Sequence, residues 1–463
     1  MNRKLTVLTV ALAVGISASA QESPKDAGIH DHITVDHHKV CVDITDFQGG
    51  TISGHADLMV RSKAAKTRSI SLNLLSMEVD EVSYRGKVLP EGSFSYDGSV
   101  LSIDLPRPLK TRKATPVGVS YHGTPQGRSF GGFTWFPQMK MAHNMGVSID
   151  DIPHSYAKSW YPAVDDFRAK STYEMTYRVP DGFTAVGNGL LQDYTDLPDE
   201  TCLWTWKISD NVPDYLINVA VAEYRHIHMD YSSISNRTVP IDIYVTPDEY
   251  DDAVKAYSIV PSVLRSLESH FGPYAFERVG YVSVNTTGGA MEHATNISMP
   301  RSPQPTASYR ELAIHELIHS WFGNRVTCER PGDMWLNEGI TSYVVETVIE
   351  DLIKEGSFTQ EDLDAYQREV DFLATYIKKG DRRYHPIADT PETDTYGNIV
   401  YKKGAWVTRK LRQLLGDEAF FGGLRNYVRE FAFDNATTEE FKASMERSTG
   451  TDLSDFFNEY IYN

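Results

Sequence analysis

The first half of the chain alternates between apolar and polar residues. Between about residue 33 and residue 228, apolar positions recur every second residue, as at Leu101, Ile103 and Leu105. Such alternation is typical of half-buried antiparallel strands. We therefore predict an N-terminal antiparallel all-β domain over residues 21–230. Residues 123–166 follow neither a strand nor a helix period, and we predict that they form a long irregular loop with a functional role.

The second half of the chain changes to helical spacing. After one more strand at 241–245, apolar residues recur every three or four positions through 254–271, where Pro261 is predicted to kink or divide the helix. Further helices are predicted over 309–322, 337–354, 404–415, 418–431 and 438–448. The fold class is therefore multidomain α+β, with a mostly helical second domain over residues 231–463.

The beginning of the chain predicts export. Basic Arg3 and Lys4 precede an apolar run from Leu5 to Ile16, and Ala18-Ser19-Ala20 follows. This is the pattern of a signal peptide over residues 1–20, and its apolar run is short for a bilayer span. We expect a periplasmic or secreted protein without a membrane partner once this segment is removed.

Composition narrows the classes of partner. The 463 residues are 41% hydrophobic, and the formal net charge is −18. An acidic chain is poorly suited to nucleic acid, so we expect no nucleic-acid partner. Three cysteines, Cys41, Cys202 and Cys328, are too few for a disulfide-rich scaffold; buried thiols are favoured, and any pairing among them stays open.

A metal site is predicted by two histidines that are four residues apart. His315 and His319 flank Glu316 in His-Glu-Leu-Ile-His, and on a helix both imidazoles point to the same side. Glu338 follows nineteen residues after His319, near the start of the next predicted helix. Two imidazoles and one carboxylate are a catalytic zinc set that leaves a fourth position for water. We therefore expect one Zn²⁺ per chain.

These motifs strongly resemble the aminopeptidase N and leukotriene hydrolase family of gluzincin zinc metallopeptidases. The resemblance extends to Trp321-Phe322-Gly323-Asn324, to Gly289-Ala290-Met291-Glu292-His293 and to Tyr161-Pro162-Ala163-Val164-Asp165-Asp166. It covers nearly the whole chain after the signal peptide. It implies a thermolysin-like catalytic domain and peptide substrates.

Roles for individual residues combine this resemblance with chemistry. Glu316 is expected to be the general base that takes a proton from zinc-activated water. The resemblance implies that Glu292 binds the free α-amino group of the substrate, within a substrate-binding segment of Gly289, Ala290, Met291 and His293. It also implies that Tyr401 stabilises the developing oxyanion, with Tyr396 as the alternative.

The chain departs from the family in three respects. His293 stands where the family has Asn, and no Gln or acid precedes Asp165 at the usual distance, so Asp150 or Asp151 is a candidate replacement. The sequence stops where the family's catalytic domain ends, without the helical C-terminal domain. This predicts a site that is either more open or covered by another subunit in a homo-oligomer.

The sequence therefore predicts an exported zinc-dependent aminopeptidase that removes N-terminal residues from peptides. Two alternatives stay open. One is an endopeptidase or dipeptidyl-type peptidase of the same fold with relaxed recognition of the N-terminus. The other is a non-catalytic binding protein built on an inherited zinc fold.

Overall fold

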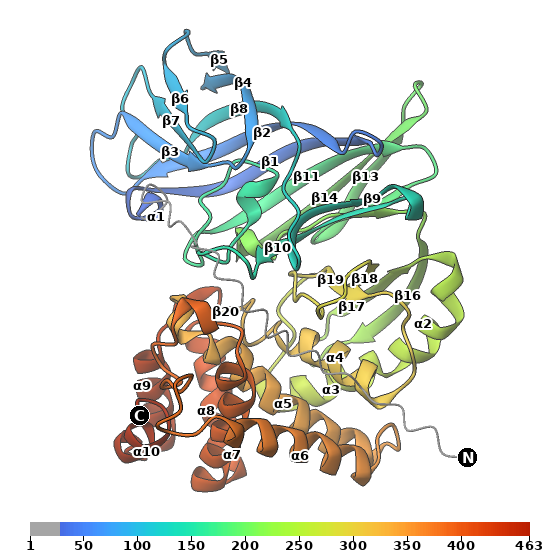
Figure 1. Cartoon of the computed structure of the whole chain (residues 1–463), viewed down its shortest axis with the longest axis vertical. Helices are drawn as coiled ribbons and strands as arrows, with labels where there is room; N and C mark the ends of the chain where they lie inside the picture. The colour runs from blue at the N-terminus through green and yellow to red at the C-terminus, as the bar shows by residue number, and fades with distance from the viewer. Residues whose placement is uncertain (1–27) are drawn as a thin grey trace.

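The chain folds into a β-rich half and a mostly helical half. The computed structural model describes residues 28–463, and Figure 1 shows the β-rich half above the helices. The predicted signal segment lies outside the described residues. This order, an all-β domain followed by a helical domain, confirms the predicted α+β class.

An eight-stranded sheet forms the body of the first domain. Its order is β13-β14-β11-β1-β2-β8-β4-β5. One pair, β1 with β11, is parallel, so the sheet is not purely antiparallel as predicted. In chain order its strands are β1 (Ile33–Asp46), β2 (Thr51–Ser62), β4 (Met77–Tyr84), β5 (Lys87–Val88), β8 (Thr115–Gly123), β11 (Lys170–Pro180), β13 (Leu190–Asp196) and β14 (Thr201–Pro213).

Two smaller sheets complete this domain. One consists of β3 (Ser69–Asn73), β7 (Val100–Asp104) and β6 (Phe94–Tyr96), and the other of β12 (Thr184–Val186), β15 (Ala220–Ala222), β10 (Met141–Ser148) and β9 (Gly131–Phe136). The strands β9 and β10 lie within the predicted irregular loop, so that prediction was wrong for these residues. Every residue of β10 is buried, and a strand buried on both faces has no alternation to reveal it.

The second domain begins with a four-stranded sheet of order β16-β17-β18-β19. Its strands are β16 (Arg225–Ser232), β17 (Thr238–Val245), β18 (Val279–Val284) and β19 (Ile297–Pro300). Residue 230, the predicted domain boundary, lies inside β16. We propose that the boundary lies just before Arg225, since β16 pairs with β17 along its whole length.

Helices make up the rest of the second domain. Pro261 lies in the first turn of α3, where a missing N–H costs nothing, and a 3₁₀ turn separates α3 from α2. The helices are α2 (Tyr250–Ala256), α3 (Val260–Phe271), α4 (Ala307–Ile318), α5 (Trp335–Lys354), α6 (Gln360–Tyr376), α7 (Gly404–Leu415), α8 (Asp417–Glu430), α9 (Thr438–Thr449) and α10 (Ser454–Tyr460), with a short α1 (Ile29–His32) before β1 and a two-stranded pair β20 (Val326–Cys328) and β21 (Asp434–Ala436).

The sequence prediction missed α6. Its signals were present, because Thr359 caps the helix with Asp362 and one face carries buried Leu363, Val370 and Ala374. The apolar face was hard to recognise in the sequence, because the rest of the helix is rich in charged residues and the apolar Phe372 lies on the exposed side.

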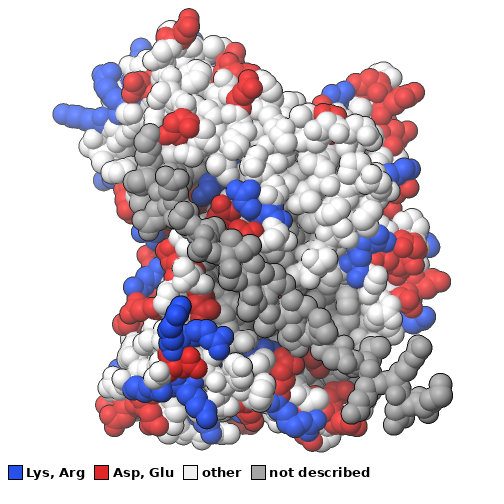
Figure 2. All heavy atoms as spheres, viewed as in Figure 1, with Lys and Arg blue, Asp and Glu red and all other residues white. Residues whose placement is uncertain are grey.

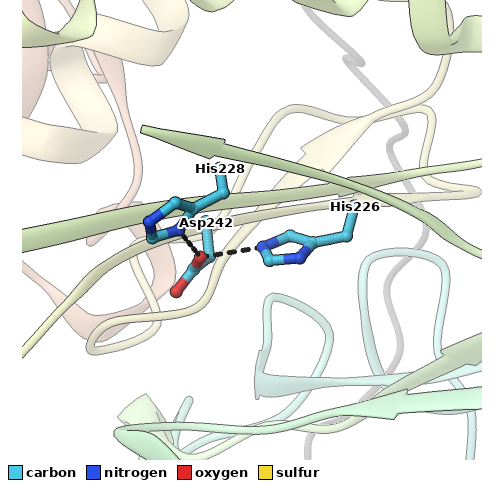
Figure 3. A group of neighbouring side chains, drawn as sticks. All are labelled: His226, His228 and Asp242. Atoms are coloured by element: carbon cyan, nitrogen blue, oxygen red, sulfur yellow. Dashed lines mark hydrogen bonds and ion pairs between the residues drawn. The ribbon is translucent and has the colours of Figure 1, made fainter. Parts of the chain in front are cut away.

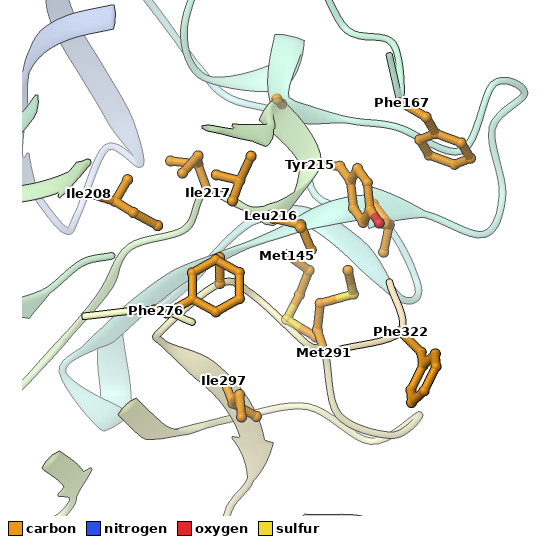
Figure 4. Close-up of a cluster of buried hydrophobic side chains, with 14 of the residues drawn as sticks. Met145, Phe167, Ile208, Tyr215, Leu216, Ile217, Phe276, Met291, Ile297 and Phe322 are labelled. Carbon is orange, nitrogen blue, oxygen red and sulfur yellow. The ribbon is translucent and has the colours of Figure 1, made fainter. Parts of the chain in front are cut away.

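The two domains share a continuous apolar core. Figure 4 shows Met145, Tyr215 and Ile217 of the first domain beside Met291 and Phe276 of the second. Buried amides reinforce this interface, since Asn218 donates to the carbonyl of Asn296 at 3.1 Å. The β domain is thereby held against the segment that contains Glu292.

The surface and the cysteines add two findings. On the face in Figure 2, basic side chains lie in small groups among acidic ones. Among residues 28–463, no helix has the length and apolar character needed to cross a membrane. All three cysteines are free; Cys202 and Cys328 are buried, whereas Cys41 is exposed, contrary to the prediction of buried thiols.

Candidate zinc centre and peptide-binding site

Three predicted ligands converge at the junction of α4 and α5. The Nε2 atoms of His315 and His319 lie 3.2 Å apart, and each lies 3.3 Å from Oε2 of Glu338. In a tetrahedral zinc site, neighbouring ligand atoms are separated by about 3.3 Å, because zinc bonds nitrogen and oxygen at about 2.0 Å. The three donor atoms therefore already have the spacing that zinc requires.

Local contacts orient His319. Its Nδ1 donates to the carbonyl of Phe322 at 2.9 Å, so Nε2 is the nitrogen that faces the other two candidate ligands. The chain turns back beneath the ring at Gly323, where φ is +129° and a Cβ would lie 2.9 Å from Nδ1. Glycine is required here because a side chain would collide with the imidazole.

Glu338 is positioned by the first turn of α5. Its backbone N–H donates to Met334 at 2.9 Å, and its side chain is buried. The preceding residue, Asn337, accepts a hydrogen bond from the N–H of Cys328 at 2.9 Å, which ties this turn to β20. Helix packing thus directs the carboxylate to the two imidazoles.

Two more carboxylates surround the same centre. One ligand atom from each of Glu292, Glu316 and His319 lies within 4.8 Å of the others. Burial raises the pKa of Glu316 well above its usual range and that of Glu292 to about 7. Burial opposes the charge on His319, but Glu338 and the other two carboxylates raise its pKa to about 10. Three carboxyl groups are therefore buried beside two imidazoles, and a bound dication would favour the ionised form of each carboxyl group.

The residues present therefore fit zinc. Spacing, the orientation of His319 and the excess of buried carboxylate all agree with a His₂Glu set. When bound, zinc would supply a Lewis acid that polarises a carbonyl and acidifies water.

The segment before Glu292 runs beside β19. Met291 and Ser298 exchange two backbone hydrogen bonds of 2.9 Å each. Asn324, two residues beyond the turn at Phe322, donates to the carbonyl of Glu292 at 2.7 Å. Gly289 has a φ of +142°, and Ala290 is half-buried. The backbone of Glu292 is thus tied to the same turn that orients His319.

His293 lies behind this segment. Its side chain is fully buried, its Nε2 accepts the N–H of Gly146 at 3.0 Å, and its Nδ1 lies 3.1 Å from Oγ of Ser298. Both nitrogens are engaged by the protein, so the side chain connects β10 to β19. We therefore interpret its position as a support for Glu292, and direct substrate contact by its side chain stays an untested prediction.

Both candidate tyrosines lie near the cluster. Tyr401 belongs to a π-helical segment, Ile399–Lys403, before α7, and its ring stacks on that of His315 with centroids 6.1 Å apart. Burial raises the pKa of Tyr401 and of Tyr396 well above the usual value, and nearby Glu338 and Glu292 add to the rise. Single π turns are frequent at functional sites. The stacking on the candidate metal ligand His315 favours Tyr401.

The two loop aspartates have partners of their own. Arg128 donates to Asp151 at 2.6 Å, and Ser129 donates to Asp150 at 2.6 Å. These bonds hold the loop after β10, and amine binding by either carboxylate stays a prediction.

Tyr215 also lies near the site and was not predicted from the sequence. This residue follows β14, is buried, and has a hydroxyl without a hydrogen-bond partner. Burial raises its pKa well above the usual value, and Glu292 is the largest electrostatic contributor to that rise. No motif marks Tyr215, because only the packing of the two domains brings it toward Glu292.

Fold and site together are typical of zinc peptidases in which a helical domain follows a β domain. Residues 34–216 match the Peptidase M1 N-terminal domain, and residues 255–460 match the Peptidase family M1 domain. The matches jointly cover most of the chain, which therefore belongs to peptidase family M1.

Curated relatives are aminopeptidases. Glutamyl aminopeptidase of Bos taurus is 27% identical over 339 residues, which are 69% of this chain and 34% of that protein. Aminopeptidase N of Streptomyces lividans is 26% identical over 451 residues, which are 91% of this chain and 49% of that protein. The chain thus spans between a third and a half of the length of these relatives.

Solved structures share the fold. The M1 zinc metallopeptidase of Deinococcus radiodurans has a TM-score of 0.80 at 20% identity, with 93% of this chain and 94% of that chain covered. Aminopeptidase A of Legionella pneumophila, in complex with aspartic acid, has a TM-score of 0.74 at 18% identity, with 93% and 50% covered.

Proposed function

We propose that the protein is an exported zinc-dependent aminopeptidase that removes N-terminal residues from peptides. One observation carries the proposal. The donor atoms of His315, His319 and Glu338 lie 3.2–3.3 Å apart, and the carboxylates of Glu292 and Glu316 lie within 4.8 Å of His319.

The position of Glu292 favours release of single residues. In an amino acid the amine nitrogen and the carbonyl carbon are separated by only two bonds, or about 2.5 Å. A carboxylate that receives this amine must therefore lie within a few ångströms of the metal ligands, as Glu292 does. A residue inside a peptide chain has an uncharged acyl group at that place and would leave the buried carboxylate unpaired.

Glu316 supplies the proton transfers. Its carboxylate lies beside the ligand set without belonging to it, so it can accept a proton from water and pass it to the leaving amine. The phenol of Tyr401 donates a hydrogen bond to the oxygen on which negative charge develops. The three ligands hold zinc, and Glu292 holds the substrate amine.

The relatives support this assignment. The relatives from Bos taurus and Streptomyces lividans are aminopeptidases, and a mutant of the Deinococcus metallopeptidase has been solved with the substrate Tyr-Ser-Ala.

The test compares one fluorogenic peptide with a free and with an acetylated N-terminus. We expect cleavage of the free form only, its loss on treatment with chelator and its return with zinc. Glu316→Gln should lower kcat by roughly 10²- to 10⁴-fold. The matched control is Glu311→Gln, on the same helix but outside the cluster.

Each outcome has a clear meaning. Equal cleavage of the free and acetylated peptides would establish the endopeptidase alternative. Activity that survives Glu316→Gln would refute the proposed base, and a folded, zinc-loaded protein without activity on any peptide would favour the binding protein. Sequencing the N-terminus of the mature protein tests the predicted export signal.

A further inference from the structure

A second group of metal-binding side chains lies on the edge strand of the second domain. The strand β16 is the outer strand of its sheet, with Ile227 and Tyr231 buried on one face. Side chains alternate along a strand, so His226 and His228 share the opposite, exposed face. Asp242 of β17 is directly opposite His228 in the register.

The two imidazoles point to one carboxylate oxygen. His226 Nε2 and His228 Nδ1 each lie 2.8 Å from Oδ1 of Asp242, as Figure 3 shows. The His226 ring also stacks on Tyr244, with centroids 4.6 Å apart and an interplanar angle of 6°. The Asp242 side chain is 13% exposed, whereas those of His226 and His228 are 43% and 49% exposed. The carboxylate therefore forms the floor of a small site that is open to solvent.

A second carboxylate orients His228. Its other ring nitrogen, Nε2, lies 3.5 Å from Oδ1 of Asp230. In metal sites, a ligating histidine commonly donates its second N–H to a carboxylate, which fixes the tautomer. Asp230 can accept the Nε2–H of His228 in this way, which leaves Nδ1 of His228 available to bind a metal ion.

The donor set selects the class of ion. Two imidazole nitrogens and one carboxylate oxygen suit Zn²⁺ and similar transition-metal dications, whereas Ca²⁺ and Mg²⁺ prefer oxygen ligands. Zinc would require the nitrogens to move from 2.8 Å to about 3.3 Å from the oxygen, a shift that exposed imidazoles can make. Solvent can fill the remaining position.

A buried cation, Arg278, lies beside the beginning of β18, the strand on the other side of Asp242 from the two histidines. Arg278 is buried and donates to the carbonyls of Gly187 and Thr295 at 2.8 Å each. A Cβ on Gly280, the register partner of Asp242 in β18, would lie 2.9 Å from this guanidinium. Arg278 therefore lies on the same face of the sheet as Asp242 but on its β18 side, whereas the two imidazoles lie on its β16 side.

We propose that His226, His228 and Asp242 form a second site for a divalent transition-metal ion of the Zn²⁺ type. The ion would fasten the edge strand β16 to β17, next to the junction between the domains. The site is separate from the candidate zinc centre. It lies on β16 and β17, whereas His315, His319 and Glu338 lie at α4 and α5, and the two groups share no residue.

The experiment titrates the zinc-loaded enzyme with ZnCl₂ in a calorimeter, so that the peptidase site is already filled. We expect one further binding event that weakens at acidic pH, as imidazole ligation requires. Both His226→Ala and Asp242→Asn should weaken this event at least about tenfold while peptidase activity is kept. The matched control His55→Ala removes another exposed histidine that is paired with a carboxylate, and it should bind as the wild type does.

Three results would overturn the proposal. They are the absence of a further binding event in the wild type, an event that is unchanged in both variants, and an event that is lost equally in the His55 control. Circular dichroism of each variant separates loss of the site from loss of the fold.

Discussion

Gly339 and Gly404 touch through their backbones. A Cβ on Gly339 would lie 2.9 Å from the Cα of Gly404, and one on Gly404 would lie 2.8 Å from the Cα of Gly339. Gly339 follows the ligand Glu338, and Gly404 follows the π turn that contains Tyr401. This contact therefore sets the distance between the proposed metal ligand Glu338 and the candidate oxyanion donor Tyr401.

We expect Gly339→Ala to separate these two elements. The new methyl group would overlap backbone that cannot move alone, at a cost of about 1–3 kcal/mol. It should lower Tm and lower kcat more than it raises KM. The control is Gly422→Ala in α8, where a Cβ meets nothing within 4 Å and alanine is the better helix former. If both substitutions have the same effect on kcat, the contact has no part in positioning Tyr401.

The two tyrosines can be separated by removing one hydroxyl at a time. Tyr401→Phe should reduce kcat by about 10²- to 10³-fold with little change in KM, because a donor to the transition state is lost. Tyr396→Phe keeps the neighbouring phenol and should have a much smaller effect. The reverse order in steady-state kinetics would assign the role to Tyr396.

Removing zinc should destabilise the folded protein. The three carboxylates of Glu292, Glu316 and Glu338 are buried together, and a dication bound only by the folded state adds about 4 kcal/mol when its free concentration is a thousandfold above Kd. Calorimetric scans with chelator and after readdition of zinc measure the shift in Tm. In the Glu338→Ala variant, most of this zinc-dependent shift in Tm should be lost. If the variant shows the same shift as the wild type, zinc stabilises the protein at a different site.

Acid should destabilise the protein through two buried histidines. Burial lowers the pKa of His143 to about 4 and that of His293 to about 3, while an unfolded chain takes up the proton near pH 6.5. The unfolded state therefore binds more protons as pH falls from about 6.5 toward 4, and each histidine costs about 1.4 kcal/mol per pH unit in that window. Above pH 6.5 this contribution should be constant.

Urea unfolding of the His143→Gln variant tests this linkage. Its free energy of unfolding should fall less steeply below pH 6.5 than that of the wild type. The matched control, His55→Gln, changes an exposed imidazole and should keep the wild-type slope. Parallel slopes for all three proteins would contradict the assignment.

Several helices could be predicted because their packing repeats within the local sequence. The spacing of His315 and His319 fixes both rings on one side of α4, and the cap at Thr437 marks the beginning of α9. Strands with one solvent-exposed face could be predicted equally well, because apolar and polar residues alternate along them. The strand β10 could not be predicted in this way, because it is buried on both faces and its sequence has no such alternation.

By itself, the sequence determined the class of fold and the chemical types gathered at the site, since periodicity and ligand spacing are local properties of the chain. Tertiary structure decided which groups meet. It brought Glu338 within 3.3 Å of both imidazoles, buried His293 behind Glu292, and placed His226 and His228 on one oxygen of Asp242. These relations depend on helix crossings, strand register and domain contacts, which residues distant in sequence determine jointly.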